Sequence, residues 1–531
     1  MPHETLLKIK PRKYQDEIYE VCREKNCLVV LPTGIGKTLI ALMLAVNRQK
    51  AFPGSKILFL APTRPLAEQH LDYFKKHLPE LFVQLELFTG KINADRREEV
   101  WQNADIIFST PQCIGNDLKN KMYDLSDVSL LIEDECHRCL KNYAYTYIAQ
   151  QYKQQAKNPR ILGLTASPGS ERKIVEQIAK NLGIEAIELR TRESEDVKEY
   201  LQELNFEIIS FDFPEEFAKI REMLQKIFIR KVDELKNRKL LFGPATKTFL
   251  LECQGRIMRA ISSGNKNFNL LAGAGCCATA IKVQHALELL ETQTLYSFHN
   301  YMNELFNQAS RQQSKAVQNL VKMPEFNQAF IALNELLAKK VENPKLIELK
   351  KIVEEELKNN SKVKIIVFSQ YRDNVTKIAN EMNSIPGIIA KVFVGQTKKS
   401  SGKGKDEVET GLSQKEQHEI IREFSQGEIN VLCATSIGEE GLDIPEVNAV
   451  IFYEPVPSAI RAIQRRGRTA RLMKGKLIIL MIKKTRDEAY HWAAFNKEKK
   501  MHRAIQNVKD DLESGEVDFQ SSDESRQKKL F

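Results

Sequence analysis

Cysteine is sparse in this chain, and long apolar runs are missing from it. Nine cysteines are scattered over 531 residues without the density or even spacing of a disulfide framework, so we expect reduced thiols. No apolar run approaches the roughly 20 residues that a membrane span requires, and the first residues, MPHETLLKIKPRK, lack the apolar core of a signal peptide. These absences favour an intracellular protein with no membrane partner.

The composition that remains is that of a globular protein of several domains. Hydrophobic residues make up 42% and charged residues 28% of the chain, and 531 residues exceed the roughly 100–200 residues of an ordinary domain. The formal charge of +10 and the pI near 8.9 fit a polyanionic partner. Because this excess is spread over a long chain, its distribution matters more than its sum.

The order of apolar segments predicts three structured regions. Residues 27–212 alternate short apolar runs, such as CLVVLP, KILFLAPT and FEIISFDF, with helix-like stretches, which predicts a parallel sheet covered by helices on both faces. A helical pattern without strands then follows, and strand–helix alternation returns from VKIIVFSQ onward. We therefore expect domains at 1–213, 214–359 and 360–509, and a disordered tail at 510–531.

A glycine-containing loop between a strand and a helix predicts a nucleotide site. The segment LPTGIGKT comprises Leu31, Pro32, Thr33, Gly34, Ile35, Gly36, Lys37 and Thr38. Lys37 would bring a positive charge to the β and γ phosphates of ATP, and the Thr38 hydroxyl could bind Mg²⁺. A chance glycine-rich turn is the competing interpretation, and Leu31 stands where the strict pattern has glycine. The strand–helix context favours the phosphate-binding loop.

Two adjacent carboxylates end a later apolar strand, VSLLIEDECHR. Asp134 is suited to hold Mg²⁺ through its water shell, and Glu135 to orient and deprotonate the attacking water. We expect His137 to relay between domains. Zinc binding by Cys136 and Cys139 is the alternative, but a second pair of ligands at suitable spacing is missing.

A basic segment in the second α/β region, QRRGRTAR, predicts arginine fingers. Arg468 and Arg471 are one helical turn apart and can point together at the γ-phosphate, with Gln464 in the same site. A solvated basic face or a nucleic-acid patch are the competing interpretations. The interruption at Gly467 and the pairing with LPTGIGKT and DECH favour a γ-phosphate sensor, so hydrolysis would require closure of the two α/β domains.

The order of these segments resembles that of the superfamily 2 helicases. Arg12, Tyr14 and Gln15 resemble the adenine-reading Q-type element, APTRPLAEQ resembles motif Ia, and TAS at 165–167 and ATSIGEEGLDIP at 434–445 follow in family order. The stretches NYAYTYIAQQY, GLSQKEQ and KKTRDEAYHWAAFNKEKKM resemble the archaeal Hef and Fanconi anaemia M family more closely. The resemblance implies an α/β fold with two tandem RecA-like parallel-sheet domains and an all-helical insertion domain between them.

The same resemblance implies an activity. Its members are ATP- and Mg²⁺-dependent DNA helicases or translocases that remodel forks and Holliday junctions in repair and fork restart, moving 3′ to 5′. It implies further ATP contacts at Arg12, Gln15, Gly441 and Asp443. A cytoplasmic, nucleoid-associated location follows from such a role.

Family resemblance also implies contacts to the phosphate backbone, which carry no sequence code. The implied residues are Pro62, Thr63, Arg64, Thr89, Gly90, Thr110, Pro111, Gln112, Ser369, Gln370, Gly395 and Thr435. Any single hydroxyl among them could instead cap its own helix. In the insertion, Lys226, Arg230 and Lys231 are the candidates for DNA contact, and a solvated helix face is the competing interpretation.

Several alternatives stay open. DECH in place of the family's DEAH also occurs in innate-immune RNA sensors and Dicer-type helicases, so a double-stranded-RNA-dependent ATPase is the second hypothesis. A DNA-binding scaffold with an inactive motor is the third, and the intact Lys37, Asp134, Glu135, Arg468 and Arg471 argue against it. The final residues, QKKLF, faintly resemble a sliding-clamp peptide, with a plain tail as the competing interpretation. A nuclease partner could act in trans.

Overall fold

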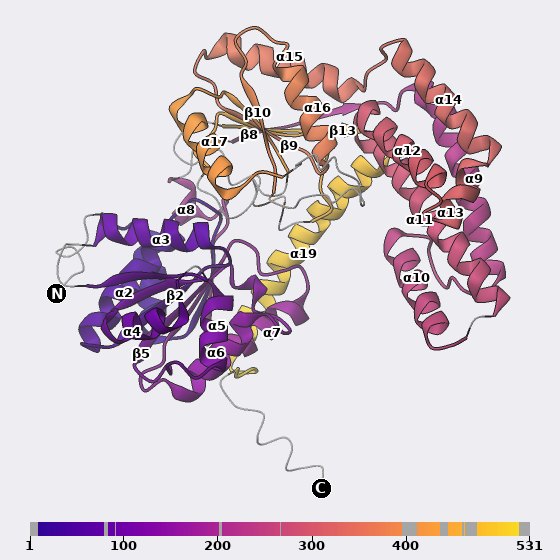
Figure 1. The fold of residues 1–531 in the computed structure, drawn as a ribbon. Helices are drawn as coiled ribbons and strands as arrows, with labels where there is room; N and C mark the ends of the chain where they lie inside the picture. The colour runs from indigo at the N-terminus through magenta and orange to yellow at the C-terminus, as the bar shows by residue number, and fades with distance from the viewer. Residues whose placement is uncertain are drawn as a thin grey trace.

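Two parallel sheets and a helical bundle make up the computed structural model of this chain (Figure 1). It describes residues 9–78, 83–90, 92–200, 204–265, 267–395, 411–435, 444–458, 461, 463 and 475–519. The predicted fold class, two parallel-sheet domains with a helical domain between them, is confirmed. Gly441, Asp443, Gln464, Arg468, Arg471 and the QKKLF peptide lie outside the described residues.

The first sheet has seven parallel strands in the order β3-β4-β2-β5-β6-β1-β7. Its strands are β1 (Cys27–Val30), β2 (Lys56–Leu60), β3 (Leu85–Phe88), β4 (Ile106–Ser109), β5 (Val128–Asp134), β6 (Ile161–Thr165) and β7 (Ala186–Leu189). Its helices are α1 (Lys13–Glu24), α2 (Lys37–Ala51), α3 (Arg64–His77), α4 (Ala94–Asn103), α5 (Pro111–Lys119), α6 (Ala144–Gln155), α7 (Arg172–Leu182) and α8 (Glu195–Lys198). The central strands β1, β5 and β6 are buried along their whole length, which explains their continuous apolar sequences.

The second sheet has six parallel strands in the order β10-β11-β9-β12-β13-β8. Its strands are β8 (Leu204–Phe211), β9 (Ile365–Phe368), β10 (Ala390–Phe393), β11 (Val431–Ala434), β12 (Ala449–Phe452) and β13 (Gly475–Ile482). The expected boundary at residue 213 is therefore wrong, because β8 pairs along its full length with β13 rather than joining the first sheet. A strand pattern reports local alternation and carries no information about which sheet the strand enters.

The helical bundle between the sheets consists of six helices within the described residues. These are α9 (Glu215–Asn237), α10 (Lys247–Ser262), α11 (Phe268–Thr292), α12 (Leu295–Ser310), α13 (Lys315–Val321) and α14 (Pro324–Ala338). The next helix, α15 (Pro344–Asn359), was expected in the insertion but packs into the core of the second sheet through Leu346, Leu349 and Val353. Helical periodicity predicts the helix without identifying the surface that buries its apolar face.

One helix of the bundle, α11, is long and apolar enough by composition to cross a membrane. It lies between α9 and α10 and contributes side chains to both cores of the bundle. Its apolar character is therefore used for helix packing.

The second sheet is also covered by α16 (Arg372–Met382) and α17 (Gln414–Gln426), and β13 leads into α19 (Arg486–Ser514). This last helix runs from the second sheet back to the first domain, as Figure 1 shows. Met501, Ile505 and Val508 belong to the first domain's core. The boundary expected at 509/510 is wrong, because the helix continues to Ser514 and Leu512 packs against the same core.

Candidate functional site

The predicted phosphate-binding loop connects β1 to α2, with Lys37 as the first helical residue. Gly34 and Gly36 have φ values of 84° and 87°, in the left-handed region that favours glycine. The Lys37 ammonium donates a hydrogen bond to the Leu31 carbonyl at 3.1 Å, which holds the side chain across the loop. The backbone amides at the start of α2 are thereby turned toward the mouth of the loop, as anion binding requires.

Helix α1 braces this loop from behind. The Gln15 amide donates to the carbonyls of Ile35 at 3.2 Å and Gly36 at 3.4 Å, and the Gln15 carbonyl oxygen accepts from the Arg12 backbone N–H at 2.8 Å. The Tyr14 hydroxyl also donates to the Ile35 carbonyl. A Cβ on Gly36 would lie 2.2 Å from Gln15 Nε2, so the loop and α1 leave no room for a side chain there. Arg12 lies over the Tyr200 ring, with its guanidinium carbon 5.0 Å from the ring centroid.

Asp134 ends β5 and faces α3. Its carboxylate accepts a hydrogen bond from His70 Nε2 at 2.8 Å, and its backbone carbonyl accepts one from the Tyr145 hydroxyl at 2.7 Å. Burial by itself would raise the pKa of Asp134, but His70 and then the charge of Lys37 hold that pKa below its usual value. The carboxylate is thus ionised and oriented, as a Mg²⁺ ligand must be.

Glu135 follows Asp134 in a left-handed backbone conformation, with φ of 50°, which is uncommon for a residue with a side chain. One of its carboxylate oxygens lies 3.2 Å from His137 Nδ1, and the same nitrogen lies 3.2 Å from the Thr165 hydroxyl. The structure therefore links His137 to the end of β6 within the first domain. Its relay to the second domain stays a prediction. Cys136 and Cys139 are buried in the apolar core.

The residues present fit ATP and Mg²⁺. The Thr33 hydroxyl is buried without a hydrogen-bond partner among the described residues, at the loop that would surround the phosphates. Thr38 and His70 line a pocket whose opposite wall is formed by His418 and Ile421 of α17, so the site opens between the two motor domains. Thr38 and Asp134 would hold Mg²⁺, which when bound neutralises charge on the phosphates. Lys37 would position those phosphates, and Glu135 would accept the proton of the attacking water.

The order of strands separates these residues from those assigned to nucleic acid. The nucleotide residues follow β1 and β5, whereas the segments 62–64, 89–90 and 110–112 follow β2, β3 and β4 at the other end of the first sheet. In the second sheet, residues 369–370, 395 and 435 follow β9, β10 and β11, which are also neighbours. Pro62, Thr63, Arg64, Thr89, Gly90, Thr110, Pro111, Gln112, Gly395 and Thr435 are thus gathered at the carboxyl edges of two strand groups.

Some of these side chains are already engaged within the protein. The Arg64 guanidinium pairs with Glu68 at 2.7 Å, and the Gly395 carbonyl accepts from Arg372 at 2.9 Å. Thr63 and Thr110 are the N-cap residues of α3 and α5, and neither side chain makes a capping hydrogen bond. Helix capping, the alternative for these hydroxyls, is therefore not what occupies them.

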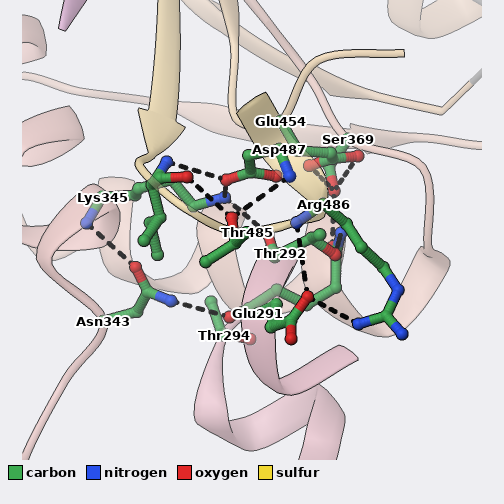
Figure 2. A network of polar contacts seen from close by, with 12 residues as sticks. Glu291, Thr292, Thr294, Asn343, Lys345, Ser369, Glu454, Thr485, Arg486 and Asp487 are labelled. Carbon is green, nitrogen blue, oxygen red and sulfur yellow. Dashed lines mark hydrogen bonds and ion pairs between the residues drawn. The ribbon is translucent and has the colours of Figure 1, made fainter. Parts of the chain in front are cut away.

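Ser369 differs from the rest, because it is fully buried in the polar network drawn in Figure 2. Its hydroxyl contacts Glu454 of the second domain at 3.1 Å and Gln293, at the end of α11, at 3.3 Å. The Gln370 backbone N–H donates to the same Glu454 carboxylate. Ser369 is thus placed to position its neighbour and the insertion rather than to meet a phosphate directly.

The network continues between the insertion and the start of α19 (Figure 2). Lys345 and Asp487 form an ion pair of 2.7 Å with both side chains fully buried, and Lys345 also donates to the Thr292 carbonyl at 2.6 Å. Arg486 pairs with Glu291 at 2.5 Å, and the Tyr490 hydroxyl donates to Glu288 at 2.9 Å. The insertion is therefore fastened to the second motor domain by charged groups.

The three cations of α9 predicted to contact DNA each have an acidic neighbour. Lys226 pairs with Glu222 at 2.8 Å, Arg230 with Glu325 at 3.0 Å, and Lys231 with Glu234 at 3.0 Å. This pairing weakens the field that a polyanion would meet at these positions. Their contact to DNA stays a prediction.

Sequence reasoning missed His70, Tyr145 and Glu454. His70 stands inside APTRPLAEQH, and its position six residues after Arg64 on α3 places it under Asp134 only once α3 is packed on the sheet. Tyr145 and Glu454 act through a backbone carbonyl and a backbone N–H, contacts for which the sequence carries no local signal.

Three protein families match consecutive parts of the chain. The DEAD/DEAH box helicase family matches residues 12–175, a helical bundle described for an ATP-dependent RNA helicase matches 216–343, and the helicase conserved C-terminal domain matches 345–473. The last two ranges meet at the start of α15, where the structure also ends the insertion.

Individual proteins match over most of the chain. The helicase domain of Hef from Pyrococcus furiosus is 43% identical, with a TM-score of 0.69, and the match covers 91% of this chain and 98% of that one. An ATP-dependent RNA helicase of Methanocaldococcus jannaschii is 39% identical over 94% of this chain and 61% of its own length. The ATP-dependent DNA helicase mph1 of Neurospora crassa is 32% identical over 91% of this chain and 42% of its own length. The chain thus spans about 40 to 60% of these two curated relatives.

Proposed function

The chain belongs to the Hef and Mph1 type of superfamily 2 helicases, and from this premise we propose that it hydrolyses ATP to translocate along and unwind DNA. The observation that carries the proposal is the junction of Lys37, Asp134 and Glu135 at the carboxyl edge of the first sheet, facing a pocket whose other wall is the second motor domain. Hydrolysis at such a site requires residues from both domains, so turnover is coupled to their relative movement.

The proposed track is branched DNA, such as forks and Holliday junctions, with movement from 3′ to 5′, in DNA repair and fork restart. Support comes from the relatives named for DNA and from the helical insertion fastened beside the motor domains. Arg468 and Arg471 are proposed as the γ-phosphate sensors of the second domain. A sliding clamp bound by the QKKLF peptide and a nuclease acting in trans are further proposed partners.

The test begins with Glu135→Gln, which removes the proposed base and keeps the size of the side chain. ATP turnover should fall by roughly 100-fold or more, while binding of a fluorescent ATP analogue stays unchanged. Glu99→Gln, the same chemical change at an exposed position of α4, should behave like the unmodified chain. Full turnover by the Glu135→Gln variant would show that the assigned mechanism is wrong.

The track is tested by comparing ATPase stimulation by forked DNA, linear duplex DNA and double-stranded RNA at one salt concentration, because affinity depends on salt. Forked DNA should stimulate most. Partial duplexes with a 3′ or a 5′ tail then test polarity, and displacement from the 3′-tailed substrate alone is expected.

A double-stranded-RNA-dependent ATPase is the second candidate. The DECH sequence and the relatives described as RNA helicases favour it. Stimulation by RNA and not by either DNA would replace the first proposal with this one.

A further inference from the structure

The half of the insertion that lies away from the second sheet presents an aromatic and cationic surface. The helices around it have their own small core, separate from the core near α19. Its members lie around the turn that follows α9, and we call them the aromatic face: Arg238, Phe242, Phe249, Arg256, Phe268 and Asn269. Nothing in the motor mechanism uses these residues.

The rings of this face are unusually open to solvent. Phe268 is 81% exposed and Phe242 is 61% exposed, although phenylalanine is ordinarily a core residue. Phe249 packs beside Gly243, next to Phe242 in the chain, and is 38% exposed. Exposed apolar groups gathered in one place mark a contact surface.

An arginine lies over each of the two most exposed rings. The Arg238 guanidinium is 6.0 Å from the Phe268 ring centroid, and that of Arg256 is 5.6 Å from the Phe242 centroid. Both arginines are held in place. Arg238 bonds Glu234 at 3.0 Å and Asn269 at 3.2 Å, and Arg256 donates to the Leu240 carbonyl at 3.2 Å. Planar cations and rings are therefore preorganised side by side.

The surrounding sequence is strongly basic. Between residues 236 and 271 there are seven basic residues, Lys236, Arg238, Lys239, Lys247, Arg256, Arg259 and Lys266, and one acidic residue, Glu252. This differs from the central part of α9, where Lys226, Arg230 and Lys231 each pair with a glutamate. The charge selects a polyanion rather than an acidic-poor protein surface as the occupant.

We propose that the aromatic face binds unpaired nucleotides of the nucleic acid, with bases stacked on Phe242 and Phe268 and phosphates beside Arg238 and Arg256. Rings recognise the flat faces of bases, which a continuous duplex keeps stacked inside, so the ligand is a single-stranded arm. In Figure 1, α10 lies on the side of the bundle toward the motor domains and α9 on the opposite side. The face beside α10 is therefore nearer to the track than the α9 cations. The assignment rests on the proposed function only in taking nucleic acid as the track.

The test uses the full chain carrying Phe242→Ala and Phe268→Ala together, and a fork with one single-stranded arm that contains 2-aminopurine. Affinity for this fork, measured by fluorescence anisotropy at one salt concentration, should fall by roughly 5- to 100-fold, the range of one lost stacking contact. Affinity for blunt duplex DNA should stay within about twofold. The quenching of 2-aminopurine on binding should disappear.

Two further variants separate stacking from folding and from simple apolar contact. Ile331→Ala, at a 59% exposed apolar position on α14, should bind like the unmodified chain. Replacing both phenylalanines by tryptophan should retain the quenching, and replacing both by leucine should lose it.

Unchanged affinity and quenching in the double alanine variant would overturn the proposal and leave the face for a protein partner. An equal loss on fork and blunt duplex would also overturn it, because stacking cannot act on a duplex. The proposed function is judged separately, by DNA stimulation of the ATPase of the unmodified chain. If that stimulation is absent while the alanine variant still loses the single-stranded arm, the motor assignment fails and the aromatic face stands.

Discussion

Replacing Lys345 by methionine should destabilise the joint between the insertion and the second motor domain. The ammonium donates to Asp487 at 2.7 Å and to the Thr292 carbonyl at 2.6 Å, and both charged side chains are fully buried. Methionine leaves the Asp487 carboxylate buried without its counter-charge. Breaking a buried pair in this way costs about 3–5 kcal/mol, whereas neutralising both partners is close to neutral. The variant Lys345→Met with Asp487→Asn should therefore recover most of the loss.

The pH dependence of this loss has a definite sign. Burial raises the pKa of Asp487 to about 6 even though Lys345 opposes the rise, so removing Lys345 should raise that pKa further. A carboxyl whose folded pKa lies above its unfolded value contributes stability at low pH and loses it as pH rises through the folded pKa. The deficit of Lys345→Met should thus be smaller at pH 5 than at pH 8.

Because a chain of several domains does not unfold in two states, local opening is the appropriate measurement. Hydrogen exchange followed by mass spectrometry should show faster exchange in peptides covering 288–294, 343–353 and 482–494 of Lys345→Met. The first-domain peptides covering 128–134 serve as an internal control. If the single and double variants exchange alike, and neither depends on pH, then the unpaired charge is not what weakens the joint.

Three further perturbations follow from the same geometry. Gly36→Ala should weaken ATP binding by roughly 10-fold or more, because left-handed backbone costs about 1–2 kcal/mol for a residue with Cβ; an analogue-binding titration measures this, and normal affinity would contradict the φ argument. His70→Ala should lower kcat by roughly 10- to 100-fold and raise the Mg²⁺ requirement, as loss of a group that orients a metal ligand does; His77→Ala on the same helix is the control, and an unchanged Mg²⁺ requirement would dissociate His70 from Asp134. Glu288→Gln should remove an acid-dependent loss of stability, because burial opposes but His285, Lys247 and Tyr490 lower the pKa of Glu288 from 4.5 to about 2. A carboxyl with a lowered folded pKa contributes stability above pH 4.5 that is lost on acidification toward pH 2, here about 2–3 kcal/mol; equal acid sensitivity of the Gln variant would refute the assignment.

Sequence reasoning reaches the parts of this molecule that local chemistry determines. The loop at 31–38 is predictable because strand, glycine and helix follow within a few residues, and the structure places them as expected. The buried strands are predictable because both of their faces are apolar. Asp134 and Glu135 are found for the same reason, since they end such a strand.

What sequence reasoning does not reach are the choices between distant partners. β8 has an ordinary strand pattern, and only its pairing with β13 reveals its sheet. α15 has an ordinary amphipathic pattern, and only its packing through Leu349 reveals its domain. His70 and Asp134 are 64 positions apart in the sequence, and a lone histidine on a helix gives no signal of such a partner.

The position of α19 joins these two levels. From Glu135, contacts lead through His137 to Thr165, whose hydroxyl accepts from the Ser167 N–H, and the Ser167 hydroxyl contacts the Met501 sulfur at 2.9 Å. Met501 stands on α19, whose other end is fastened to the insertion by Arg486 and Tyr490. A helix of 29 residues spans roughly 43 Å as one rigid element.

Movement of the second motor domain over the first must therefore shift the Met501 contact or bend α19. Either change acts on the residues around Glu135 and on the insertion through the same helix. A chain built from two sheets joined by flexible connections would let the insertion drift independently of hydrolysis. Here β8 and α19 both cross between the domains, so the insertion is expected to change position with each closure of the nucleotide site.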